Sequence, residues 1–167
     1  MNVYITYGTI DFLSKLQQKH QNENMVLLQK VNTSALIHET NGPSLFSEPK
    51  KYVNIDQYGD LVSNSRFASI HHIPVKVEGR PLFEQLFKEH ARLFEKEKGL
   101  TALRILKPLQ SNEYIVLTFW EKEENFNNWK VSQSYRNAFE GKRGFLKRRS
   151  LFKPSFSTTY YVVLEEE

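Results

Sequence analysis

The stretch that decides the fold is LTFWEKEENFNNWKVSQSYRNAF, residues 117–139. It opens with β-branched and aromatic residues that are typical of a strand, and this strand ends at Trp120. The acidic segment that follows predicts the start of a helix over 121–129, which carries the pattern Phe-x-x-Trp at Phe126 and Trp129. We therefore expect a strand that leads directly into a helix.

The chain around this stretch adds the other elements of an α+β domain. From residue 66 the predicted elements are a strand (67–77), a helix (80–98), two strands (101–106 and 114–120), two helices (121–129 and 132–139) and a closing strand (157–164). The long helix has an apolar stripe opposite charged residues, and Gly99 stands where a C-terminal cap belongs. This order is the ferredoxin-like alternation, in which helices cover one face of an antiparallel sheet.

Residues 1–65 have the pattern of a smaller, β-rich unit. Its predicted elements are strands over 3–7, 25–29, 35–39 and 52–58 and a helix over 12–19 with Asp11 as the N-cap. An exposed apolar sheet face is unstable, so we expect this unit to cover the open face of the following sheet. The predicted fold class is therefore α+β: a ferredoxin-like C-terminal domain (66–167) of the dimeric α/β-barrel type, packed on a small N-terminal α+β domain (1–65).

The composition limits the classes of function. The chain has 167 residues, and its 40% apolar and 13% aromatic content suits a packed core and pockets for flat ligands. The absence of cysteine excludes disulfides, iron–sulfur clusters and cysteine-based zinc sites. The sequence has no apolar run of eighteen residues and no signal peptide, so we expect a cytoplasmic protein without a membrane partner.

Basic residues gather in one segment near the C-terminal end of the sequence, although the net charge is only +4. These residues are Lys142, Arg143, Lys147, Arg148, Arg149 and Lys153. A solvated loop is the first interpretation of such a run, and an anion site is the second. No nucleic-acid-binding motif accompanies the run, so we expect no nucleic-acid partner.

Residues 117–139 resemble the signature of the antibiotic-biosynthesis-monooxygenase (ABM) domain, especially that of its heme-degrading members. Four further stretches, at 4–9, 36–42, 78–83 and 158–160, are similar to the two-domain heme-degrading monooxygenases of Bacillus. The staphylococcal TRAP family (target of RNAIII-activating protein) has the same length and order of elements. The resemblance implies that the N-terminal domain takes the place of a second subunit, giving a monomer with an internal pseudo-dimer or a weak homodimer.

The resemblance also implies a heme site, with heme as both cofactor and substrate and an external electron donor as partner. Trp129 matches the family tryptophan that presses on the porphyrin. Phe139 stands at the position of the family's axial histidine, and a phenyl ring cannot bind iron. The family's polar distal residue matches His71, which strand alternation places on the same face as Phe67, with His72 on the opposite face. His71 is therefore the candidate for both a catalytic role and the metal ligand.

Other residues are candidates for holding the cofactor, beside the unremarkable alternative that each is a packed or solvated side chain. His90 lies on the apolar stripe of the long helix, where a histidine is more often a core residue than a ligand. Tyr135 is a phenol one turn before Phe139, and phenolates bind ferric iron in catalases. Arg136 and the basic run are suited to pair with heme propionates.

Three functions remain open from the sequence. The leading hypothesis is a heme-degrading monooxygenase that opens the porphyrin and releases iron. The alternative is a non-catalytic ligand-binding, stress-response or signalling protein of the TRAP type that kept the fold and lost the heme ligand. A third interpretation is a cofactor-free ABM-type oxygenase that acts on an aromatic small molecule.

Overall fold

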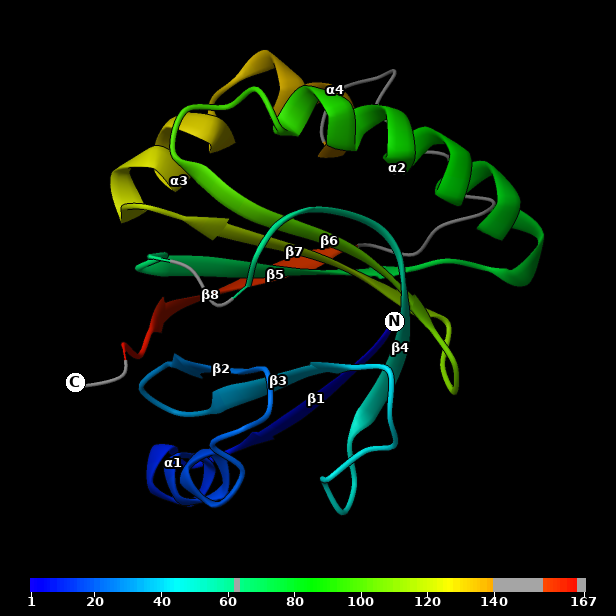
Figure 1. Cartoon of the computed structure of the whole chain (residues 1–167). Coiled ribbons are helices and arrows are strands. Elements are labelled where there is room, and N and C mark those ends of the chain that lie inside the picture. The colour runs from blue at the N-terminus through cyan, green and yellow to red at the C-terminus, as the bar shows by residue number, and fades with distance from the viewer. Residues whose placement is uncertain (62–63, 140–154, 165–167) are drawn as a thin grey trace.

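The strands of the protein form one closed barrel. The computed structural model describes residues 1–61, 64–139 and 155–164. Around the barrel the strands follow the order β1-β3-β2-β8-β5-β7-β6-β4, and every neighbouring pair is antiparallel. Figure 1 shows the helices α2, α3 and α4 on one side of this barrel and α1 on the other.

The elements match the predicted order in both parts of the chain. The first part contains β1 (Asn2–Gly8), α1 (Ile10–Lys19), β2 (Met25–Gln29), β3 (Ser34–Thr40) and β4 (Lys50–Gly59). The second part contains β5 (Phe67–Pro74), a short 3-10 helix (Val77–Gly79), α2 (Arg80–Phe94), β6 (Leu100–Pro108), β7 (Glu113–Trp120), α3 (Glu123–Lys130), α4 (Gln133–Phe139) and β8 (Phe156–Val162). The α+β class and the ferredoxin-like order are confirmed.

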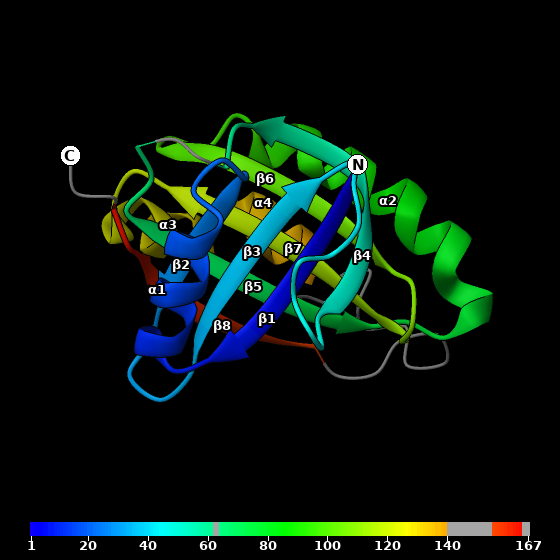
Figure 2. The same cartoon turned by 60° about the horizontal axis from the view of Figure 1, so that its bottom comes forward.

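The two parts of the barrel repeat the same strand order. Within the second part the neighbours run β8-β5-β7-β6, and within the first part they run β4-β1-β3-β2. The last strand of each part pairs with the second strand of the other, through β4 with β6 and β8 with β2. Figure 2 shows β1, β2 and β3 crossing in front of β5 and β7, which form the opposite wall. The division into domains 1–65 and 66–167 stays a prediction, because both parts share one sheet.

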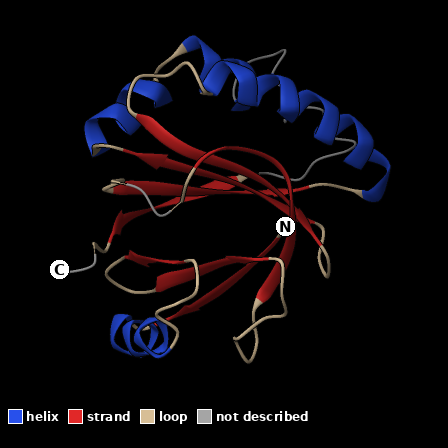
Figure 3. Ribbon diagram, viewed as in Figure 1, coloured by secondary structure: helices blue, strands red, loops and turns tan. Residues whose placement is uncertain are grey.

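Side chains alternate between the two faces of the sheet and so build separate cores. One core fills the barrel interior, with Ile5, Ile37 and Leu117 among its buried members. A second core lies between the sheet and α2–α4, and a third, smaller one lies under α1. The layers are visible in Figure 3, where strands lie between two outer layers of helix. The candidate site belongs to the second core.

The predicted N-cap of α1 was wrong, and the predicted ends of α2 and β5 lay several residues too far along the chain. Thr9, not Asp11, is the N-cap of α1, because its hydroxyl accepts the Phe12 backbone N–H at 3.3 Å. The helix α2 ends at Phe94, and turns occupy the residues up to Gly99, whose φ of +87° suits a glycine. The strand β5 stops at Pro74, since proline cannot donate to the ladder.

The described residues contain no helix that is long and apolar enough to cross a membrane. The basic run over 142–153 lies outside the described residues, so both interpretations of it stay predictions.

Candidate functional site

The candidate site is built around His71, on the face of β5 that is covered by helices. His71 pairs with Val116 of β7, which lies in the core under α2–α4, so the predicted orientation is confirmed. Its side chain is buried, and its ring stacks on Phe139 with the centroids 4.6 Å apart. Trp129 and Tyr135 contact the same imidazole, at 5.7 and 6.0 Å between centroids. The structure therefore brings together four of the predicted site residues.

The imidazole of His71 is electrically neutral in this environment. Burial lowers its pKa from the ordinary 6.5 to about 3, and the nearby charges of Lys130 and His72 act in the same direction. The Ser69 hydroxyl lies 3.5 Å from Nδ1, at the limit of a hydrogen bond. Within the described part of the chain, Nε2 is buried and has no hydrogen-bond partner. One ring nitrogen is thus left without a hydrogen bond.

Trp129 lies at the centre of the aromatic cluster. Its side chain is fully buried and packs between Phe94, at 5.0 Å, and Trp120, at 5.3 Å. The helix α3 positions this ring, because Phe126 and Trp129 both face the sheet, as their spacing predicts. The indole Nε1 has no hydrogen-bond partner among the described residues. Two buried nitrogens without partners therefore lie in one cluster.

Phe139 holds the cluster closed. It ends α4 and contacts Phe87 and Phe94 of α2 as well as His71. The surface pockets beside β4, α1 and α2 contain none of the rings that touch His71. In this conformation, aromatic rings occupy the space between His71 and the helices.

Two predicted site residues lie apart from His71. His90 packs against Phe87 and Phe94, and burial lowers its pKa. Arg136 is exposed on α4, whereas Tyr135 and Phe139 of the same helix are buried. His90 is therefore a peripheral member of the aromatic core, whereas Arg136 lies on the surface of the protein.

Sequence reasoning missed the polar residues beneath the cluster. The hydroxyl of Ser69 is hydrogen-bonded to that of Thr118, which also accepts the Trp120 indole N–H at 2.9 Å. Strand alternation was the available signal, since Ser69 shares a face with His71. The described residues hold no group of three or more His, Cys, Asp or Glu side chains suited to a metal ion. A single axial ligand to heme iron does not require such a group.

Residues 66–141 match the family described as antibiotic biosynthesis monooxygenase. This part of the chain is therefore an ABM domain, and it contains β5–β7 and α2–α4 with all the predicted site residues.

The chain is similar to known proteins of two kinds, one named for heme degradation and the other for signal transduction. A heme-degrading monooxygenase of Listeria monocytogenes is 28% identical over 130 residues, which are 78% of this chain and 77% of that protein. The signal transduction protein TRAP of Staphylococcus epidermidis is 23% identical over 139 residues, which are 83% of each.

Solved structures share the whole architecture. The structure of a major regulator of staphylococcal pathogenesis has a TM-score of 0.87 at 20% identity and covers 98% of this chain and 100% of that chain. That of a heme-degrading enzyme from Listeria monocytogenes has a TM-score of 0.74 at 23% identity, with 96% and 99% covered. At these identities the likeness shows the fold alone.

Proposed function

We propose that the ABM domain binds heme in the aromatic cluster under α2–α4 and degrades it, opening the porphyrin and releasing its iron. The observation that carries this proposal is His71, a buried neutral imidazole with Nε2 unpaired among aromatic rings. A neutral imidazole is the usual axial ligand of heme iron, and flat apolar walls suit a porphyrin. The similarity to a heme-degrading monooxygenase supports the same class of substrate.

The residues of the cluster fit heme in their chemistry and define what each side chain would do. His71 would hold the iron through Nε2, and Trp129 and Tyr135 would form walls of the pocket. Arg136, exposed on α4, would pair with a propionate. Phe139 has to rotate away from His71, because its ring now lies against the imidazole. Bound heme would supply the iron at which oxygen is activated, with electrons from an external donor.

A titration with hemin, followed by ascorbate under air, tests this proposal. We expect a saturable Soret band that decays as iron is released. His71→Ala should abolish the band, because the iron ligand is removed. His90→Ala is the matched control, since it also removes an imidazole from the aromatic core but leaves His71 in place. Equal heme binding by both variants would reject His71 as the ligand.

A second function is favoured by the stack of Phe139 on His71. Here the cluster is a closed core, and the protein is a non-catalytic member of the fold, like a protein named for signal transduction. The wild type would then show no saturable Soret band. Phe139→His should restore heme binding in that case, because it returns an imidazole to the position of the family ligand. A variant that folds and still binds no heme would contradict this explanation of the loss.

A further inference from the structure

A chain of buried polar side chains runs beneath the aromatic cluster and ends at His71. It begins at Trp120, whose indole N–H donates to the Thr118 hydroxyl at 2.9 Å. The Thr118 hydroxyl is hydrogen-bonded to that of Ser69, the residue directly opposite it on β5. The Ser69 hydroxyl lies 3.5 Å from Nδ1 of His71, which is the longest contact of the chain. One continuous chain therefore joins an indole N–H to the imidazole.

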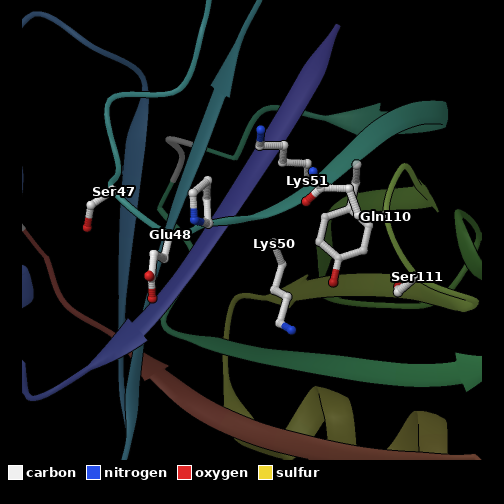
Figure 4. Close-up of a pocket in the computed structure, with 8 residues that line it drawn as sticks. Ser47, Glu48, Lys50, Lys51, Gln110 and Ser111 are labelled. Atoms are coloured by element: carbon white, nitrogen blue, oxygen red, sulfur yellow. The ribbon is translucent and has the colours of Figure 1, made fainter.

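This chain of polar groups is closed to solvent. The four residues that form it have exposed fractions of at most 2%. The open pocket beside β4, drawn in Figure 4, is lined by residues 47–52, 110 and 111 and contains none of the four. The protons of the chain are therefore shared among its own members.

The indole at the far end favours one direction of the chain. An indole N–H can only donate, whereas a hydroxyl has one proton to donate and two lone pairs to accept. If Thr118 donates to Ser69, then Ser69 donates to Nδ1, and the three bonds run head to tail. In the reverse direction Thr118 accepts twice, and its own proton has no acceptor among the described residues.

Each direction leaves one buried proton unpaired, on Nε2 of His71 in the first case and on Thr118 in the second. Only the head-to-tail chain lets each hydrogen bond polarise and strengthen the next. Nδ1 is then the acceptor at the end of the chain. A neutral imidazole has one ring proton, and burial keeps this ring neutral by lowering its pKa to about 3. The ring proton therefore resides on Nε2.

Two other buried histidines face acceptors instead of a donating hydroxyl. Nε2 of His38 lies 2.9 Å from the Glu23 carboxylate, and Nδ1 of His72 lies 2.6 Å from that of Glu113. An ionised carboxylate only accepts, so the ring nitrogen that faces it carries a proton. A hydroxyl can donate or accept, and its own partners decide which. Of these three histidines, His71 is the one whose tautomer depends on a chain of neighbours.

We propose that Ser69 is a positioning residue of the candidate site, which holds the ring proton of His71 on Nε2 while the cluster is closed. Ligation of iron by Nε2, which rests on the proposed function, then requires the ring proton to move to Nδ1. Nδ1 would donate to the Ser69 oxygen, and the Ser69 hydroxyl would turn its own proton toward Thr118. The imidazole stays neutral, since one proton is lost at Nε2 and one is gained at Nδ1. Metal-bound imidazoles commonly donate their second N–H in this way, so one hydroxyl serves both states.

Two-bond ¹H–¹⁵N correlation spectra of the full chain, labelled at histidine and free of heme, test the positioning role. Such spectra distinguish a protonated ring nitrogen from an unprotonated one, and His71→Ala assigns the His71 signals among the five histidines. We expect the wild type to have its proton on Nε2 and an accepting Nδ1. In Ser69→Ala the Nδ1 resonance should shift toward that of a nitrogen without a hydrogen bond. Ser69→Thr keeps the hydroxyl and should keep the wild-type position.

Ser34→Ala is the matched control for the loss of a buried serine hydroxyl from a strand. Ser34 is buried as well, but its hydroxyl is bonded to the backbone of Lys30. The His71 signals of this variant should match those of the wild type. A proton on Nδ1 in the wild type, or an Nδ1 resonance that does not move in Ser69→Ala, would overturn the positioning role.

Zinc protoporphyrin, a diamagnetic analogue of heme, tests the step that rests on the proposed function. Binding should move the ring proton of His71 from Nε2 to Nδ1. A complex in which the proton stays on Nε2 would reject His71 as the metal ligand. Absence of saturable binding would contradict the proposed function, while the spectra without porphyrin still decide the role of Ser69.

Discussion

His71 and His72 are adjacent in the chain but lie in two different regions of the molecule. His71 faces the helices, is enclosed by Trp129, Tyr135 and Phe139, and keeps Nε2 unpaired within the described residues. His72 pairs with Ile115, a member of the interior core, and therefore faces the barrel interior, where its Nδ1 lies 2.6 Å from the Glu113 carboxylate. The same side chain is thus a neutral core group on one face of the strand and a partner of a carboxylate on the other.

The comparison teaches that the face of a strand, and not the motif, decides what a histidine does. Alternation separates the two imidazoles, and the covering elements then set their chemistry. Aromatic rings remove water from His71 and disfavour its charge, whereas Glu113 offers His72 an acceptor.

The largest expected difference between the two regions is their response to the loss of a ring. Trp129→Ala should lower the free energy of unfolding by about 3–5 kcal/mol, because it leaves a cavity in a fully packed core. Phe156→Ala, beside His72, should have a much smaller effect, since that side chain is 54% exposed. Urea denaturation of both variants measures the difference. Similar losses would show that the two regions are equally well packed.

The region around His71 should also lose stability in acid, because the folded chain keeps this imidazole neutral. The unfolded chain protonates His71 near pH 6.5, whereas the folded chain does so only near pH 3, so the unfolded state binds more protons between these values. Stability should therefore fall as pH decreases through this window. Between pH 7 and pH 5, the wild type should lose about 2 kcal/mol more than His71→Leu. Unfolding free energies that fall in parallel for the two proteins would contradict the buried neutral state.

The smallest effect is expected from the hydrogen bond between His72 and Glu113 on the other face. Glu113→Gln removes the charge that His72 contacts, but the Glu113 side chain is 32% exposed and water replaces part of the interaction. The loss of stability should be at most about 1 kcal/mol. Chemical denaturation at neutral pH checks this value, with Glu113→Asp as the variant that keeps the charge. A loss of unfolding free energy comparable to that of Trp129→Ala would show that the contact between His72 and Glu113 contributes as much to stability as a buried core side chain.

Sequence reasoning reached the fold because its signals are local. The strand over 114–120, the Phe126–Trp129 spacing and the alternation of His71 with His72 each depend on a few neighbouring residues, and the structure has all three. The end of α2 was misplaced because the charged residues after Phe94 continue the helical pattern although the chain turns there.

The site could be predicted only where it lies on consecutive positions or follows a family motif. The contact between His71 and Phe139 joins β5 to α4, and the predicted roles of both residues came from the resemblance. The contact between His72 and Glu113 was missed, because the two residues come from β5 and β7, which are far apart in sequence. No pattern of neighbouring residues in the sequence predicts that such distant residues are in contact.

The reciprocal pairing of β4 with β6 and of β2 with β8 has a consequence for biosynthesis. The strand β8 bridges β2 and β5, so the hydrogen-bonding edges of both strands stay open until β8 has left the ribosome. Open edges are templates for pairing with other chains. We therefore expect nascent chains that lack β8 to depend on chaperones, while the finished barrel offers its neighbours no such edge within the described strands.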